Sequence, residues 1–319
     1  MTAARSTHLA LGGGAEFDIV RALVERWGTA SFGTGDDAAL LDVPAGRHLV
    51  VSTDSSVEHV HFRRDWLSAE EIGYRAAAAA ISDLAAMGAT PLAMTLALTL
   101  PERWRSQITA IADGIAQAAR ATGTPIVGGD LTSGGELSFS ITVLGTAVRP
   151  LLRSGARTGD TVWVTGRLGG PRLALASYER GTVPPGALRE RFARPVPRLR
   201  EARWLAAHGA TAAIDCSDGI AADLDHVAAA SRKRIVLHLE SLPRIDGATD
   251  EDAARSGEEY EVIATAPPSL DAAAFEREFS VPLTAVGTVE DLGAAGPGVD
   301  AFRHGVPVAL PHGHDHFAS

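Results

Sequence analysis

Cysteine and lysine are almost absent from this chain of 319 residues, and each absence excludes a class of site. The single cysteine, Cys216, rules out an internal disulfide and a cysteine-based zinc cluster. The single lysine, Lys233, lies in SRKRI, which does not match the G-x-x-x-x-G-K-[ST] phosphate-binding loop. If the protein binds ATP, it therefore does so without a P-loop.

Long apolar runs and an excess of positive charge are also missing. No unbroken run of 18 apolar residues occurs, which excludes a transmembrane helix. The apolar part of the N-terminus is too short for a secretory signal and soon meets Glu16, so we expect a cytoplasmic protein. The net charge of −10 argues against nucleic-acid binding. It leaves room for a small anionic ligand, because metal ions can bridge carboxylates to phosphates.

Expected helices and strands alternate in both halves of the chain, which predicts an α/β or α+β fold with two domains. In the first half we expect helices over 16–28, 68–88 and 101–121 and strands over 48–54, 91–100, 124–130 and 137–148. In the second half we expect strands over 161–166, 211–219 and 234–239 and one entered within 256–265, with helices near 170–179 and 222–231. The turn-rich stretch 153–160 is the candidate boundary, giving domains 1–152 and 153–319.

Acidic residues recur where an expected strand or helix gives way to a loop. They stand in GDD (35–37), STD (52–54), SD (82–83), GGD (128–130) and IDCSD (214–218). Taken singly, most of these are ordinary turn or capping chemistry. Asp83 is less ordinary, because it interrupts an apolar helix face. Several carboxylates beside Ser and Thr hydroxyls suit Mg²⁺, and strand ends of α/β sheets are where ligands bind.

In order along the chain, these motifs resemble those of the thiamine-monophosphate kinase family. The resemblance is carried by GTGDDAAL, STDSSVEHVHF, SDLAAMGA, GGDLTSG, RSGARTGD, IDCSDG, SGEEYE and a terminal HDHF, from about Glu16 to Phe317. The family belongs to a wider ATP-dependent group that includes aminoimidazole ribonucleotide synthetase. The resemblance implies an N-terminal domain that binds ATP and Mg²⁺ and forms a homodimer through its sheet. It also implies a C-terminal α+β domain that closes over the active site.

The resemblance also implies a reaction and a set of site residues. The γ-phosphoryl of ATP would pass to the phosphate of thiamine monophosphate, an acceptor that is already ionised and needs no general base. The implied magnesium ligands are Asp37, Ser52, Thr53, Asp54, Asp83, Asp130, Asp215 and Asp218, with Asp36 left open beside Asp37. Gly129, Asp130, Arg153 and Ser217 would contact ATP, and His61, Glu258 and Phe317 would hold the substrate. Asp83, Asp215 and Arg153 are the implied catalytic residues.

Three positions depart from the family pattern and keep two alternatives open. Ala80 stands where an asparagine is usual, and Ser256 and Glu259 replace a glycine and an aspartate. One alternative is another ATP-dependent enzyme of the same group with a different small-molecule substrate. The other is a nucleotide-binding or thiamine-phosphate-binding protein without turnover. Retention of the full set of acids favours catalysis.

Overall fold

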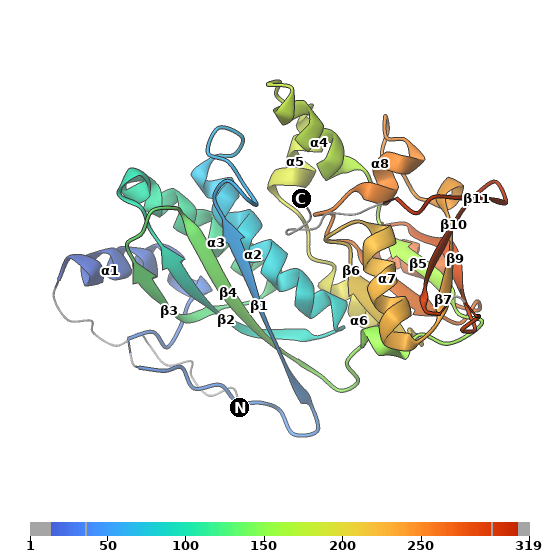
Figure 1. Ribbon diagram of the computed structural model, residues 1–319. Helices are drawn as coiled ribbons and strands as arrows, with labels where there is room; N and C mark the ends of the chain where they lie inside the picture. The colour runs from blue at the N-terminus through green and yellow to red at the C-terminus, as the bar shows by residue number, and fades with distance from the viewer. Residues whose placement is uncertain (1–13, 36, 295, 312–319) are drawn as a thin grey trace. The chain divides into compact units, whose positions relative to one another are not determined.

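The computed structural model describes residues 14–311 except residues 36 and 295, so the predictions on Asp36 and Phe317 lie outside the described residues. The chain divides into two compact units (Figure 1). Of the described residues, one unit holds those up to Leu84 together with Thr90–Val148. The other unit holds Ala85–Ala89 and the described residues from Arg149 onward. The prediction of a two-domain α/β protein is confirmed.

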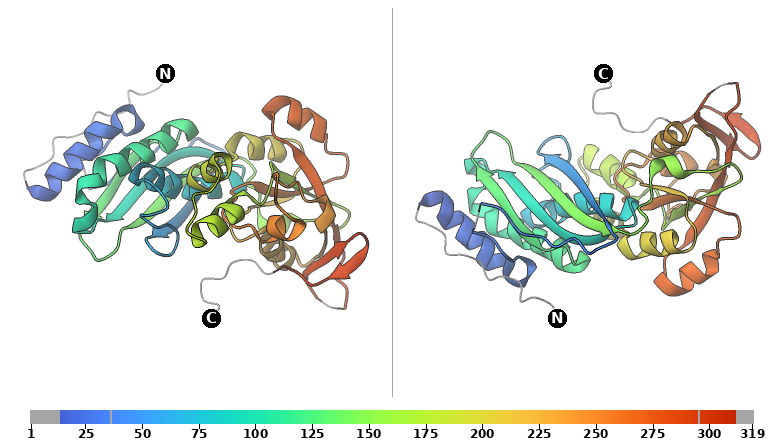
Figure 2. Two further views of the ribbon diagram at one scale, coloured as in Figure 1. Left: turned by 90° about the horizontal axis from the view of Figure 1, so that it is seen from above. Right: turned by 90° about the horizontal axis from the view of Figure 1, so that it is seen from below.

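The first unit is built on a four-stranded sheet. Its strands lie in the order β1 (His48–Val57), β4 (Ser138–Ala147), β2 (Thr90–Thr99) and β3 (Ile126–Thr132). Strands β2 and β3 pair in parallel, and β4 is antiparallel to both of its neighbours, β1 and β2. Helices α2 (Ala69–Ala86) and α3 (Ile108–Thr122) cover one face of the sheet, and α1 (Ala15–Trp27) packs beside α3 (Figures 1 and 2).

Helix α2 begins where the sequence predicts it. The Glu71 backbone N–H donates to the Ser68 hydroxyl at 3.2 Å, and the Ser68 N–H donates to the Glu71 carboxylate at 2.8 Å. The helix ends before Gly88, whose φ of 61° is the left-handed value that glycine accepts without strain. The segment after Pro101 differs from the prediction, because Glu102–Gln107 forms a 3₁₀ helix before α3. This turn buries Trp104 against Glu58, a tertiary contact that local periodicity cannot reveal.

Two acidic motifs do not lie at strand ends, contrary to the prediction. STD at 52–54 lies in the middle of β1, because β4 pairs with all ten residues of that strand. GGD at 128–130 lies inside β3. A Cβ atom at Gly129 would stand 2.0 Å from the Leu96 carbonyl oxygen, so this glycine permits close approach of two strands and does not make a turn.

The second unit is built on a mixed seven-stranded sheet. Its strands lie in the order β11 (Val306–Val308), β10 (Gly298–Arg303), β7 (Arg234–His238), β9 (Leu283–Glu290), β5 (Thr161–Thr165), β8 (Val262–Ala266) and β6 (Ala212–Asp215). The helices are α4 (Gly170–Glu179), α5 (Gly186–Ala193), α6 (Leu199–Ala207), α7 (Ile220–Ser231), α8 (Asp250–Arg255) and α9 (Ala272–Phe279). Helix α7 buries Ile220, Leu224 and Val227 in the core of this sheet. Among the described residues, no helix has the length and apolar character needed to span a membrane.

A buried carboxylate, Glu58, ties the end of β1 to the loop before β4 and to the 3₁₀ turn. It accepts hydrogen bonds from the Trp104 indole at 2.9 Å, the Leu137 N–H at 3.2 Å and the Arg103 guanidinium at 2.6 Å. Burial alone would raise the pKa of Glu58, but these donors and the charge of Arg103 together lower it. The ionised form is therefore the one that stabilises this unit.

We expect Glu58→Gln to destabilise the first unit at pH 7 by on the order of 1–3 kcal/mol, because the buried donors lose their charged acceptor. A lowered carboxyl pKa contributes stability above its ordinary value of about 4.3 and loses it as the pH falls through the lowered value. The difference between variant and wild type should therefore shrink below about pH 4 in urea denaturation. Glu102→Gln, at an exposed carboxylate, is the control. An equal loss at pH 7 and pH 3.5 would contradict this assignment.

Candidate active site

The first unit brings Ser52 of β1 and Asp83 of α2 into direct contact. Ser52 lies opposite Val143, which is fully buried, so its side chain faces the helices. From there its hydroxyl donates to Asp83 Oδ2 at 2.5 Å. Asp54 is two residues along β1 and faces the same side, opposite buried Ile141. These three predicted magnesium residues therefore share one face of the sheet.

The side chains of Thr53 and Asp130 point to the other face of the sheet, away from the helices. The Thr53 hydroxyl lies 2.8 Å from that of Thr142, its partner on β4. Asp130 lies opposite Ala97 and is exposed. Since β4 and β2 separate their strands, Thr53 and Asp130 are roughly 14 Å apart, three strand spacings. Oxygen ligands lie about 2 Å from Mg²⁺, so these two side chains of one subunit do not share an ion.

His61 is held in a tight loop that follows β1. Its backbone N–H donates to the Val57 carbonyl at 2.9 Å, and the Val57 N–H donates to His61 Nδ1 at 3.1 Å. A ring nitrogen that accepts a hydrogen bond carries no proton, so the proton of the neutral imidazole is on Nε2. In this tautomer His61 can donate a side-chain hydrogen bond only from Nε2.

In the second unit, carboxylates gather where β6 meets α7. Asp215 ends β6 and is 5% exposed, and Asp223 on the first turn of α7 is 1% exposed. The Asp223 carboxylate accepts the N–H groups of Asp218 and Gly219 at 3.4 and 3.1 Å. Burial, and then the charges of Asp215 and Asp218, raise the pKa of Asp223 well above its usual value. A divalent cation would relieve this repulsion, so these oxygen donors fit Mg²⁺.

Glu258 lies beside this acidic loop. Its N–H donates to the Ser217 carbonyl at 2.6 Å, and the Tyr260 N–H donates to the Cys216 carbonyl at 2.9 Å. A Cβ atom at Gly257 would be 2.6 Å from the Ser217 oxygen, so a side chain at 257 would push the two segments apart. The structure thus places the predicted substrate residue Glu258 next to the predicted ATP residue Ser217.

Of the remaining predicted residues, two are at the surface and one position is buried. Asp37 and Arg153 are exposed, and the Arg153 carbonyl accepts the Ser231 hydroxyl at 2.7 Å. Ala80 is fully buried in α2, so the usual asparagine is replaced by a side chain that needs no polar partner. Some of the predicted magnesium ligands belong to the first unit and the others to the second. Each unit therefore carries one part of the predicted ligand set.

Sequence reasoning missed Asp223 and a buried network of arginines and glutamates around Glu259. Asp223 had a signal in the sequence, because an acidic residue in the first turn of a helix after Asp-Gly suits the exposed N–H groups there. Arg191 and Arg198 had none, since both pair with glutamates more than 60 residues away.

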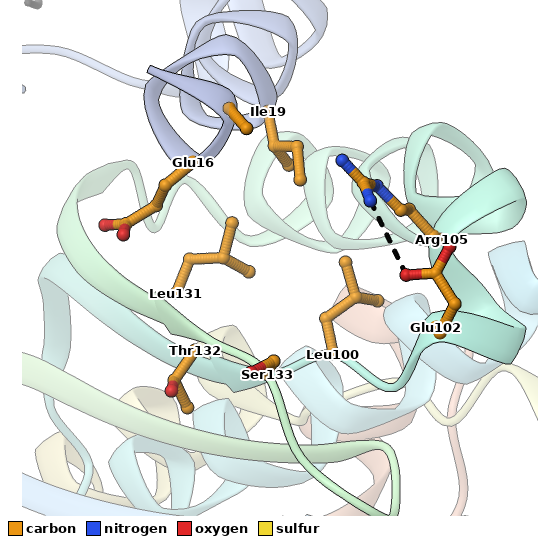
Figure 3. Close-up of a pocket in the computed structure, with 9 residues that line it drawn as sticks. Glu16, Ile19, Leu100, Glu102, Arg105, Leu131, Thr132 and Ser133 are labelled. Atoms are coloured by element: carbon orange, nitrogen blue, oxygen red, sulfur yellow. Dashed lines mark hydrogen bonds and ion pairs between the residues drawn. The ribbon is translucent and has the colours of Figure 1, made fainter.

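Two other features of the first unit do not involve the predicted residues. Glu58, His59 and Glu136 bring three ligand atoms within 4.8 Å of one another, but Arg103 already donates to both carboxylates. A cavity of about 320 Å³ lies between α1 and the ends of β2 and β3 (Figure 3). It is lined by Ala15, Glu16, Ile19, Leu100, Glu102, Arg105, Leu131, Thr132 and Ser133.

Comparison with known families first defines the class of the fold. Residues 35–147 match the family described as AIR synthase related protein, N-terminal domain. Residues 157–299 match AIR synthase related protein, C-terminal domain. Both units of this chain are therefore of the AIR synthase related type.

Individual relatives show which family within the AIR synthase related proteins this chain resembles. The chain is 38% identical over 277 residues to the thiamine-monophosphate kinase of Rhodopirellula baltica, covering 81% of this chain and 83% of that protein. The crystal structure of thiamine-monophosphate kinase from Stenotrophomonas maltophilia superposes with a TM-score of 0.79 at 36% identity, covering 95% of this chain and all of that one. AaThiL complexed with AMPPCP and TMP superposes with a TM-score of 0.75 at 29% identity, covering 95% and 97%. The chain belongs to the thiamine-monophosphate kinase family.

Proposed function

We propose that this protein transfers the γ-phosphoryl group of ATP to the phosphate of thiamine monophosphate, forming thiamine diphosphate. The observation that carries the proposal is the 38% identity to a thiamine-monophosphate kinase, over a match that spans most of both chains. A relative of the same fold has been solved with AMPPCP, an ATP analogue, and TMP together, which correspond to the two substrates of this reaction.

In this proposal the acidic residues of both units hold Mg²⁺. Asp83, Ser52 and Asp54 are the donors of the first unit, and Asp37 and Thr53 are further candidates there. Asp215 and Asp218 are the donors of the second. Bound Mg²⁺ would neutralise the phosphate oxygens so that two anions can approach each other. The charge repulsion around Asp223 supports a cation at this place.

The remaining predicted residues would position the two substrates, ATP and thiamine monophosphate. Arg153, Ser217 and the Gly129–Asp130 pair would contact ATP. His61 would donate a hydrogen bond from Nε2 to thiamine monophosphate. Glu258 would interact with the cationic or amino-bearing part of that substrate. Phe317 is proposed to stack on the thiamine ring. No side chain needs to remove a proton, because the acceptor phosphate is already ionised.

Chromatography of thiamine phosphates tests the activity. Purified protein with ATP, Mg²⁺ and thiamine monophosphate should form thiamine diphosphate, and excess EDTA should abolish the product. ATP hydrolysis or transfer to another acceptor without thiamine diphosphate would favour a different substrate within the same group. ATP binding in calorimetry without any turnover would favour a non-catalytic binding protein.

We further propose a homodimer in which Asp130 serves the active site of the partner subunit. Leu49 and Val51, on the sheet face away from the helices, are 47% and 55% exposed, as expected for a surface that a second copy covers. The Asp130 side chain points to this same face, whereas Asp83 lies on the face that the helices cover. The sheet thus separates the two carboxylates within one subunit, and a second copy could bring them together.

Mixing two inactive variants tests this arrangement. Asp83→Asn and Asp130→Asn subunits, unfolded together and refolded at equal amounts, should recover about a quarter of wild-type activity, since half of the dimers are mixed and each restores one of two sites. Each variant refolded alone is the control. No recovery, although mixed dimers form, would place Asp130 in its own subunit's site. A monomeric wild-type protein would reject the dimer.

A further inference from the structure

A carboxylate with no access to solvent lies directly beneath the loop that carries Glu258. The side chain of Glu259 is 0% exposed. One of its oxygens accepts the Gly169 N–H, and the other accepts Arg191 Nη2 at 2.9 Å. The hydroxyl of Ser256, three residues earlier and fully buried, accepts the Arg172 N–H at 3.3 Å. Two donors from two separate segments therefore converge on the Glu259 carboxylate.

Arg191 links this carboxylate to a second one. Its Nη2 also donates to Glu261 at 3.3 Å and to the Arg167 carbonyl at 2.7 Å. Glu261 is in turn held by Arg198, which donates to both of its oxygens at 2.7 Å. Two arginines thus balance two buried glutamates, the condition under which buried charges are tolerated.

The backbone above the network is strained. Glu258 and Tyr260 have φ angles of 57° and 53°, in the left-handed region that side chains rarely adopt. Residues in this region persist only when their surroundings hold them. Here the holding contacts are those of Glu259 below and the hydrogen bonds to the Cys216 and Ser217 carbonyls beside it.

We propose that Arg191 is a positioning residue: through Glu259 it fixes the direction of Glu258 and the conformation of the adjacent acidic loop that carries Ser217 and Asp218. This inference rests on the proposed function for its kinetic consequence. Arg191 acts on bound substrate through Glu259 and the strained loop, and Ser256 is fully buried. Two of the three residues that depart from the family pattern, Ser256 and Glu259, lie three residues apart in this loop and are both buried, so on this account they form a matched pair.

Arg191→Met tests the positioning role kinetically. We expect the KM for thiamine monophosphate to rise about tenfold or more, because Glu258 loses its direction, and kcat to fall by a smaller factor, because Asp218 lies in the adjacent loop. Arg234→Met is the matched control, since Arg234 pairs with Asp300 in the same unit but away from this loop. Its melting temperature should fall while both KM values stay at wild-type level.

Hydrogen–deuterium exchange gives a readout that does not depend on activity. Amides of residues 256–261 and 215–219 should lose protection in Arg191→Met and keep it in Arg234→Met. If Arg191→Met does not fold, Ser256→Gly replaces it, because this variant keeps both buried charges and removes only the buried hydroxyl of the same loop. The same loss of protection is expected.

A double-mutant cycle tests the matched pair. Ser256→Gly and Glu259→Asp should each raise the KM for thiamine monophosphate. In the double variant the rise should be smaller than the product of the single rises, because the two buried side chains lie in one loop and their effects are not independent. Rises that multiply would reject the pairing.

The outcomes separate this inference from the proposed function. A wild-type protein without kinase activity would end the proposed function, while the exchange comparison would still decide whether Arg191 holds the loop. An active wild type and an Arg191→Met variant with unchanged KM and unchanged protection would overturn the inference alone.

Discussion

Asp83→Asn should reduce the formation of thiamine diphosphate by about a thousandfold or more while the fold stays intact. Asparagine has the shape of aspartate and can still accept the Ser52 hydroxyl, so the contact between β1 and α2 survives. It lacks the negative charge that a magnesium ligand needs beside the phosphates. The loss should therefore appear in kcat, measured by chromatography of the product at saturating ATP and Mg²⁺.

The control for this variant is a carboxylate of α3 outside the site. Asp113 pairs with Arg26 of α1, and Asp113→Asn should retain near wild-type turnover. Circular dichroism and the melting temperature of Asp83→Asn should match those of the wild type within a few degrees. Undiminished turnover in Asp83→Asn would remove Asp83 from the metal site.

Asp215→Asn should make the metal-free protein more stable and yet inactive. Burial and then the charges of Asp215 and Asp218 raise the pKa of Asp223, so the folded protein binds a proton there that the unfolded chain releases. Stability of the metal-free wild type therefore falls as the pH rises above about 4 toward the raised pKa. Removing the charge of Asp215 reduces the repulsion on Asp223, so the metal-free protein loses less stability at high pH. The same change removes a proposed magnesium ligand, so activity is lost.

Melting temperatures in EDTA and in Mg²⁺ measure this trade-off. In EDTA at pH 8, Asp215→Asn should melt a few degrees above the wild type, the shift that about 1 kcal/mol produces in a domain of this size. Added Mg²⁺ should raise the melting temperature of the wild type and leave that of the variant nearly unchanged. Asp300→Asn, which removes a carboxylate paired with Arg234, is the control. A variant that is less stable in EDTA, or that keeps the Mg²⁺ shift, would contradict the assignment.

The elements followed from the sequence wherever a local pattern had a local cause. Ser68 and Glu71 predicted the start of α2 because a capping box involves residues three apart. The boundaries of β1 and β3 did not follow, because partner strands decide how far a strand extends. The polar residues of STD and the glycines of GGD predict strand ends, but pairing with β4 and β2 extends both strands beyond them.

For the site, the sequence by itself determined which residues could act: acids beside hydroxyls, without a P-loop lysine, in the order of one kinase family. Only the tertiary structure decided where they point. Register places Asp54 and Asp130 on opposite faces of one sheet, because neighbouring residues of a strand alternate in direction. The packing of α2 on β1 brings Asp83 to Ser52, across 31 residues of chain. Burial, which no local pattern encodes, couples Asp223 to Asp215 and Glu259 to Arg191, because charges interact strongly only where water is excluded.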